Sequence, residues 1–159
     1  MPNFALLIRT KEVENVATVA PIAGRRWGLK LSCASCSEVT PNFVYIDESE
    51  TVESDGGSAN AMFSCKFCKK QISVNVLTKA YGTYDCTSAK PMPVAGFEVR
   101  GAEPVEAHLE EGWTVVATES EKEFSEGVNL DDDWVDYDDK GEQSVSILGV
   151  EVSFAKLGK

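Results

Sequence analysis

The sequence predicts an all-β protein with a β-sandwich-like body. Short segments rich in β-branched and aromatic residues recur along the chain, separated by clusters of Gly, Pro, Asp or Ser. Helical periodicity is poor almost everywhere. The chain has 159 residues, the length at which one domain with one sizeable core is the default. We therefore expect a single domain over residues 1–159.

The expected strands can be taken in order. Residues 4–19 alternate imperfectly between apolar and polar, Pro21 and Gly24 interrupt the pattern, and residues 27–31 resume it. Seven more segments have strand character: 44–46, 62–64, 72–77, 97–99, 113–118, 144–148 and 150–154. The one helical prediction covers about two turns at residues 120–126, ended by Gly127.

Two Cys-x-x-Cys motifs, Cys33/Cys36 and Cys65/Cys68, carry the clearest chemical signal, with 28 residues between them. Each motif places two thiols on a tight turn, and four thiolates complete a tetrahedral shell. Zinc favours this donor set because it is borderline-soft and has no geometric demand from d-electrons. The sequence thus predicts one structural Zn²⁺ in a closed four-cysteine site of the zinc-ribbon type, with no open position for a catalytic water.

The two motifs predict a zinc-knuckle lobe at about residues 28–80, inserted in the β body. The usual separation is nearer 15 to 20 residues, so the insert should hold extra structure, namely a strand at residues 43–46 and a turn at residues 55–57. The segment has few large apolar side chains. A structural zinc contributes about 10–16 kcal/mol in small zinc domains, so losing one thiolate should unfold this lobe.

A second interpretation of the cysteines is a thiol-redox or metal-transfer protein in which Cys65 and Cys68 work as a pair. Thiol oxidoreductases place such a motif at the start of a helix. Here Pro41 follows the first motif and the strand-like residues 72–77 follow the second, which disfavours redox chemistry. Structural disulfides are disfavoured by the odd number of cysteines, five, and by the absence of an Asn-x-Ser/Thr sequon.

Read together with the rest of the chain, the cysteine motifs resemble those of the small eukaryotic CXXC-motif-containing zinc-binding protein family. The resemblance covers nearly the whole length and implies a β-sandwich-like body, a zinc site formed by the four cysteines and no enzymatic activity. The family often has Gly after the second cysteine, so Ser37 should adopt a left-handed backbone conformation. The matching features are Trp27, Gly-Gly-Ser-Ala-Asn at residues 56–60, Cys65-Lys-Phe-Cys68, residues 97–105, Gly112-Trp113, residues 133–138 and residues 142–145.

The formal charge of −11 is unevenly distributed. Residues 1–90 carry ten Lys or Arg against nine Asp or Glu, whereas residues 91–159 carry five against seventeen. Such acidity repels phosphate backbones and anionic lipids, so we expect neither nucleic acid nor membrane as a partner. We expect a monomer that binds a protein through the acidic strip of residues 119–142 or through a basic zinc tip. The basic zinc tip comprises Arg25, Arg26, Lys66, Lys69 and Lys70 around an exposed Phe67.

The remaining candidate residues receive structural interpretations. Cys86 is expected to be a small buried or half-buried side chain, and His108, the single histidine, a surface residue. No stretch approaches the roughly 18 apolar residues of a membrane span. The sequence thus predicts an intracellular, non-catalytic binding or scaffold protein, cytoplasmic in location, with the nucleus also compatible.

Overall fold

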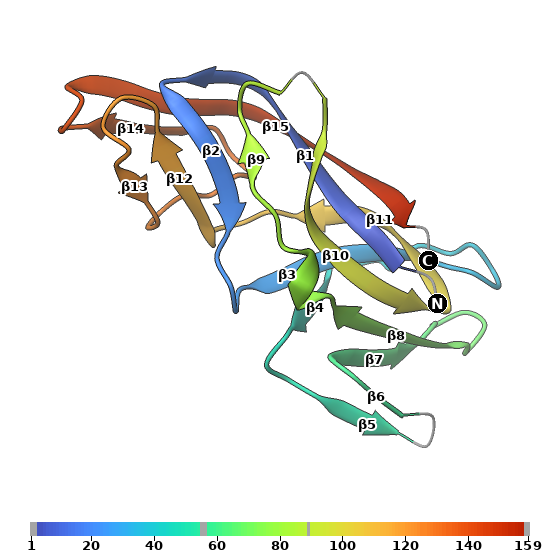
Figure 1. Cartoon of the computed structure of the whole chain (residues 1–159). Coiled ribbons are helices and arrows are strands. Elements are labelled where there is room, and N and C mark those ends of the chain that lie inside the picture. Colours follow the sequence, from blue (N-terminus) through green and yellow to red (C-terminus); the bar gives the residue numbers. More distant parts are fainter. Residues whose placement is uncertain (1–2, 55–56, 89, 158–159) are drawn as a thin grey trace.

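The chain folds almost entirely into strands, as the computed structural model shows for residues 3–54, 57–88 and 90–157 (Figure 1). The one helix in this described part is a 3₁₀ turn, η1 (Thr78–Ala80). The strands are β1 (Asn3–Glu14), β2 (Val16–Pro21), β3 (Arg26–Cys33), β4 (Val44–Asp47), β5 (Val52–Ser54), β6 (Gly57–Ala59), β7 (Ala61–Ser64), β8 (Gln71–Val76), β9 (Tyr84–Asp85), β10 (Met92–Arg100), β11 (Ala102–His108), β12 (Trp113–Ala117), β13 (Glu123–Phe124), β14 (Trp134–Asp138) and β15 (Gln143–Leu157).

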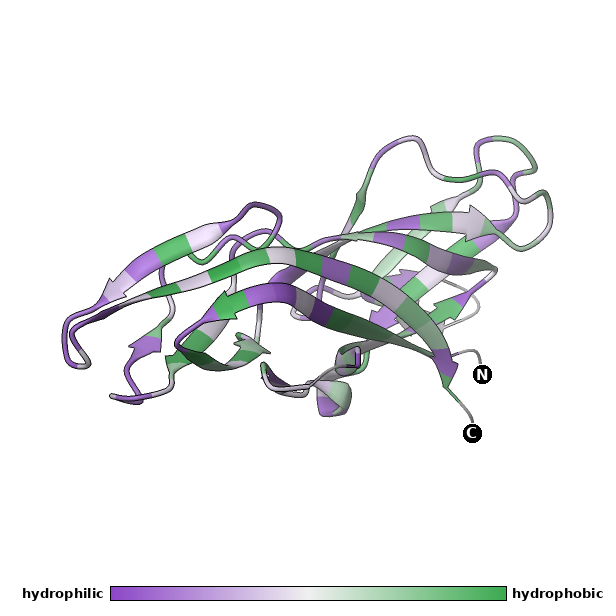
Figure 2. Ribbon diagram, turned by 90° about the horizontal axis from the view of Figure 1, so that it is seen from above, coloured by the Kyte–Doolittle hydropathy of each residue, from purple (hydrophilic) through white to green (hydrophobic). Residues whose placement is uncertain are grey.

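The largest sheet of the body is curved and has six strands, in the order β14-β15-β1-β10-β8-β7. Its long strands extend from one end of the molecule to the other (Figure 2). A four-stranded sheet, β13-β12-β2-β9, and a three-stranded sheet, β11-β3-β4, lie against it. Buried side chains from all three sheets, such as Phe97, Val115 and Leu29, belong to one hydrophobic core. The predicted all-β, sandwich-like class is confirmed.

Two of the expected strand boundaries differ from the structure, each because of a residue with positive φ. Residues 4–19 form β1 and β2, separated by Asn15 with φ 57°. Conversely, residues 144–148 and 150–154 are one continuous strand, β15, interrupted only by Gly149 with φ 72°. This single residue shifts the alternation of the strand, so that apolar side chains on both sides of it pack on the core.

The helix predicted at residues 120–126 is wrong. Residues 118–120 form a turn, and Glu123–Phe124 form β13, in which Phe124 pairs with Val115. The side chain of Phe124 is buried against the ring of Trp134, at a centroid distance of 5.3 Å. Packing against residues distant in sequence therefore overrides a weak local preference for helix.

Residues 28–80 contribute strands to both sides of the molecule. β3 and β4 belong to the three-stranded sheet, whereas β7 and β8 form one edge of the six-stranded sheet. The extra structure expected in the long insert is present as β4 and the β5–β6 hairpin. Of the turn predicted at residues 55–57, residues 55 and 56 lie outside the described residues.

Asn60 fixes the return of the chain from this hairpin. Its side-chain amide donates to the carbonyl oxygens of Glu48 and Glu50, at 3.3 and 2.8 Å. Its side-chain oxygen accepts from the N–H of Val76 at 2.8 Å, and its own N–H donates to Asn75 at 2.9 Å. One polar side chain thus joins the segment after β4 to β8, which gives a physical role to the last residue of the Gly-Gly-Ser-Ala-Asn motif.

Candidate metal centre

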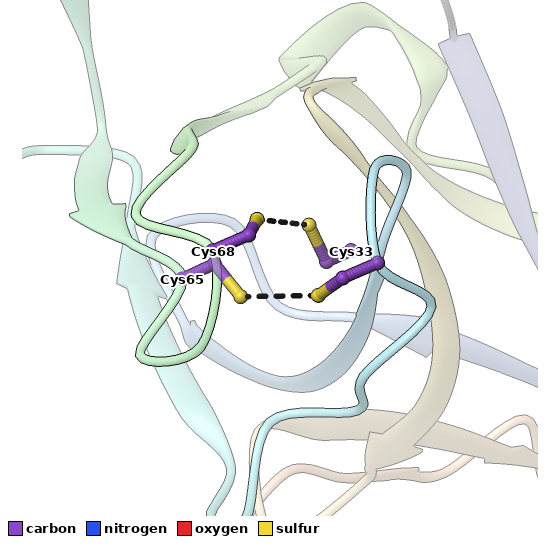
Figure 3. Close-up of side chains that lie close together, drawn as sticks. Cys33, Cys65 and Cys68 are labelled. Atoms are coloured by element: carbon purple, nitrogen blue, oxygen red, sulfur yellow. Dashed lines mark hydrogen bonds between the residues drawn. The ribbon is translucent and has the colours of Figure 1, made fainter.

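The four predicted metal ligands come from two turns at the same end of the molecule. Cys33 is the last residue of β3, and Cys65 directly follows β7. The two turns face one another with their sulfur atoms between them (Figure 3). The Sγ atoms of Cys33 and Cys68 are 3.5 Å apart, those of Cys36 and Cys65 are 3.6 Å apart, and all four lie within 4.8 Å of one another.

These distances fit a tetrahedral zinc site. With Zn–S bonds of about 2.3 Å, the sulfurs at the corners of a regular ZnS₄ tetrahedron are about 3.8 Å apart. The five cysteines of the chain are free thiols. The donor set, four sulfurs and no oxygen, is the one that structural zinc sites prefer.

The two knuckles have the same backbone hydrogen bonds. In the first, the N–H of Ser37 donates to the Cys33 carbonyl, and the N–H of Cys33 donates to the Glu38 carbonyl, both at 2.9 Å. In the second, Lys69 and Cys65 repeat the first bond at 2.9 Å. Ser37 and Lys69 both have φ 66°, so the left-handed conformation predicted at Ser37 is confirmed. Neither knuckle leads into a helix.

Backbone amides aimed at the sulfurs favour the thiolate form. The N–H groups of Cys36 and Ser35 lower the pKa of the Cys33 thiol to about 6. The corresponding N–H groups of Cys68 and Phe67 lower the pKa of the Cys65 thiol. These amides supply partial positive charge to sulfurs that must lose their protons to bind a metal.

Cys36 behaves differently while no cation is present. The N–H of Glu38 favours its thiolate, but burial and the three neighbouring sulfurs outweigh that bond and raise the pKa of Cys36 to about 12. Four adjacent thiolates repel one another, so the metal-free cluster keeps a proton here. Positive charge held between the four sulfurs would favour the thiolate of Cys36 and release that proton to solvent.

The site is buried on one side and open on the other. Cys33 and Cys65 are buried, Cys36 is half-buried and Cys68 is exposed. Cys33 ends a strand of the three-stranded sheet, whereas Cys65 lies at the edge of the six-stranded sheet. An ion held by all four sulfurs therefore cross-links the two sheets.

Gly101 lies between the knuckles, a role that the sequence analysis missed. Its carbonyl accepts from the N–H of Ala34 at 2.9 Å, and it packs against the carbonyl oxygen of Gln71, the first residue after the second knuckle. Gly101 has φ 85°. Only the topology of the folded chain shows that Gly101 touches both turns.

The basic zinc tip is smaller than expected. Lys66, Phe67, Lys69 and Lys70 are exposed on the second knuckle, and Phe67 is 66% exposed. Arg25 is not part of the tip, because its guanidinium is buried over the rings of Trp27 and Trp113, at 4.1 and 4.7 Å from their centroids.

Arg26 also lies away from the metal end, at the far end of β3. It stacks over Tyr45 at 4.1 Å and pairs with Glu110 at 2.9 Å. The tip therefore consists of Lys66, Lys69 and Lys70 around Phe67.

The acidic strip of residues 119–142 is partly anchored in the core. Its apolar side chains Phe124, Val128, Leu130 and Trp134 are buried. Asp138 is fully buried as well, and accepts hydrogen bonds from the Ser120 hydroxyl at 2.6 Å and from the N–H groups of Lys140 and Gly141 at 3.0 Å. Val135 and Tyr137 are exposed on β14.

The remaining thiol and the histidine lie outside the cluster. Cys86 is half-buried, and burial raises the pKa of its thiol to about 12. His108 is half-exposed with its ring 4.0 Å from that of Phe43 and Nδ1 3.5 Å from the Asp131 carboxylate. Cys86 is thus half-buried, as expected, and His108 is partly exposed at the surface.

No helix in the described part of the chain is long and apolar enough to cross a membrane.

Comparison with known proteins agrees with the geometry. Residues 6–155 match the family described as CXXC motif containing zinc binding protein, eukaryotic. A mouse protein of that description is 36% identical over 163 residues, covering 98% of this chain and 99% of the relative, and its human counterpart is 34% identical with the same coverage.

Solved structures show the same fold. The crystal structure of C1orf123 matches with a TM-score of 0.89 and 32% identity, covering 98% of this chain and 99% of that one. A hypothetical protein from Plasmodium falciparum matches with a TM-score of 0.82 at 24% identity, covering 98% of this chain and all of that one, which shows the fold alone.

Proposed function

We propose that this chain, which belongs to the eukaryotic family of CXXC motif containing zinc binding proteins, holds one structural zinc ion and works as a non-catalytic protein-binding module. The ion is bound by Cys33, Cys36, Cys65 and Cys68, whose sulfurs already lie within 4.8 Å of one another. That convergence carries the proposal, because two turns 28 residues apart have little other reason to bring four thiols together.

The structural role follows from the connectivity of the site. Four protein sulfurs fill the tetrahedral shell of zinc, which leaves no coordination position for a substrate or an activated water. The ligands join the end of β3 to the edge of the other sheet. Zinc there contributes to folding rather than to chemistry. Four reduced thiols also suit a reducing compartment, so we place the protein in the cytoplasm.

The binding role is supported by the surface around the metal. Phe67 is a large aromatic side chain exposed between two cysteine ligands, and lysines flank it in sequence. Exposed aromatic residues held on a rigid turn are common anchors of protein interfaces. The rest of the molecule is acidic, as the total charge of −11 for the whole chain shows, and its field would orient such a partner.

A second candidate function is metal transfer or thiol redox chemistry at Cys65 and Cys68. The exposure of Cys68 favours it, because a solvent-accessible ligand is the first that another thiol can attack. In this alternative the Cys65/Cys68 pair would release its metal or cycle to a disulfide.

Metal analysis combined with a thiol count separates the two functions. A structural site predicts one zinc per chain and four thiols that stay silent to a thiol reagent until a chelator removes the metal. Less than one zinc per chain, with a Cys65/Cys68 pair that oxidises and is reduced again while Cys33 and Cys36 stay protected, would instead support the alternative.

The binding role is tested by affinity capture with the intact protein and with Cys65→Ser. We expect partners recovered by the intact protein and lost with the variant, because the variant disorders the metal end. Recovery of no specific protein with either form would overturn the proposed binding role while leaving the zinc assignment intact.

A further inference from the structure

A small apolar groove opens directly beside the metal site, with a volume of about 160 Å³. It lies between the segment that follows the first knuckle and the strand that leads into the second. The buried ligands Cys33 and Cys65 form part of its wall. Its apolar lining consists chiefly of Leu31, Val39, Phe43, Phe63, Phe67 and Ile72.

The groove has a buried floor and an exposed rim. Leu31 and Ile72 at its floor are almost fully buried, at 0% and 1% exposure. Val39 and Phe67 at its rim are 44% and 66% exposed. A cavity of about 150 Å³ lined by apolar side chains accommodates a benzene-sized ring, so this groove has room for one aromatic or large aliphatic side chain.

Two sheet edges border the groove. Val44 comes from β4, the edge strand of the three-stranded sheet, and Phe63 comes from β7, the edge strand of the six-stranded sheet. Cys33 ends β3, which pairs with β4, and Cys65 directly follows β7, so an ion bound by both cysteines would tie these two edges together. The groove is thus a fixed opening of the sandwich, which favours binding without large rearrangement.

The charges at the groove set it apart from the rest of the protein. Lys66 lines it, and Lys69 and Lys70 follow on the same exposed turn, against Glu38 on the opposite wall. A protein with a total charge of −11 therefore carries an excess of positive charge around this apolar groove. Such a rim attracts carboxylates and discriminates against basic segments.

We propose that this groove binds an acidic polypeptide segment, taking up one aromatic or large aliphatic side chain flanked by carboxylates. The apolar side chain fills the space between Val39 and Phe67, and the flanking carboxylates face Lys66 and its neighbours. This inference rests on the proposed binding role and names the chemistry of the partner.

The probe is a synthetic peptide with a central phenylalanine flanked by two glutamates on each side, titrated into the zinc-loaded protein and followed by two-dimensional ¹H–¹⁵N NMR. We expect saturable shifts confined to the amides of residues 38–44 and 63–72. The same peptide with alanine in place of phenylalanine, or with lysines in place of the glutamates, should bind at least about fivefold more weakly.

Matched variants locate the binding. Phe67→Ser should weaken the peptide at least about fivefold, whereas Tyr137→Ser, which removes an exposed aromatic residue at the far end of the molecule, should not. Lys66→Glu should weaken binding about threefold and Glu38→Gln should strengthen it. Zinc content and the dispersed spectrum of each variant verify that its fold is kept.

Three outcomes would overturn the inference. The first is no saturable shift with the phenylalanine peptide, and the second is equal binding of the alanine or lysine peptide. The third is association that appears with protein concentration alone and is lost in both Phe67→Ser and Tyr137→Ser, which would identify a second copy of the chain as the occupant. This experiment uses a synthetic peptide and zinc-loaded protein. A negative result would therefore reject the acidic peptide as the occupant of the groove without deciding the affinity-capture test of the proposed binding role.

Discussion

The α-carbon of Gly101 lies so close to the carbonyl oxygen of Gln71 that a β-carbon at residue 101 would come within 2.6 Å of that oxygen. Both residues contact or adjoin the metal site. The carbonyl of Gly101 accepts a hydrogen bond from the N–H of Ala34 in the first knuckle, and Gln71 follows the second knuckle. The packing of the two knuckles therefore depends on the absence of a side chain at one position.

Gly101→Ala should lower the free energy of unfolding by about 2–4 kcal/mol and speed the release of zinc to a chelator. The contact is with backbone, so the neighbour cannot rotate away. Thermal unfolding and the rate of zinc transfer to a chromogenic chelator measure the two effects.

Gly24→Ala is the matched control, because Gly24 has φ 86° but nothing within 4 Å of its would-be β-carbon. It carries the same backbone strain without the clash and should cost about 1 kcal/mol. Equal effects of the two variants on stability and on zinc release would show that the close contact at residue 101 is unimportant.

The two ligands of the second knuckle should differ in their importance. Cys65 is buried and Cys68 is exposed. Cys65→Ser should therefore leave a buried three-thiol cluster that binds zinc poorly, whereas in Cys68→Ser a water molecule can take the vacant coordination position. We expect Cys65→Ser to lower the unfolding free energy by at least about 3 kcal/mol, and Cys68→Ser by less. Metal content per chain and urea unfolding of both variants test this, and a larger loss for Cys68→Ser would contradict it.

Ser37 adopts φ 66° at the end of the first knuckle, a conformation that costs energy for any residue with a β-carbon. Ser37→Gly removes that strain and should raise the unfolding free energy by about 0.5 kcal/mol, after subtraction of the extra freedom of glycine in the unfolded chain. Ser35→Gly in the same turn, where φ is negative, adds only that freedom and should destabilise the protein. Thermal unfolding in the presence of zinc compares them.

Cys86 should remain unreactive after a chelator has exposed Cys33 and Cys65, whose thiol pKa values are lowered. Burial raises the pKa of its thiol to about 12, so at pH 8 almost none of it is thiolate. The pKa of Cys86 in the folded protein lies above its value of about 8.5 in the unfolded chain. The contribution of the protonated thiol to the free energy of unfolding is therefore complete below about pH 8.5 and is lost as the pH rises towards 12. Mass spectrometry after timed alkylation checks the order, and rapid modification of Cys86 at pH 8 would refute it.

The strands and the metal site could be predicted from local patterns. Segments such as residues 72–77 and 113–118 alternate clearly, and the cysteine spacing by itself indicates which thiols should meet. The left-handed turn at Ser37 was predicted from the glycine that related sequences often have there, and the structure confirms it.

What sequence could not supply depends on contacts between distant segments. Phe124 joins a sheet because β12 offers Val115 as its partner, which no local pattern reveals. Arg25 is charged and so was placed on the surface, yet two tryptophans 86 residues apart in the chain enclose it. The groove beside the metal exists only because the ends of two different sheets meet there.

The location of the cysteines at one end of the sandwich gives the molecule two unequal halves. Removing the metal frees only the edges formed by β4 and β7, whereas at the other end Arg25, Trp27 and Trp113 remain interleaved within the hydrophobic core. The apo form should thus be a partly opened protein rather than an unfolded chain, with rapid amide exchange in β4 to β7 and slow exchange in β12 and β15. Occupancy of the metal site would then determine whether the surface at the cysteine end is ordered, while the other end keeps its fold.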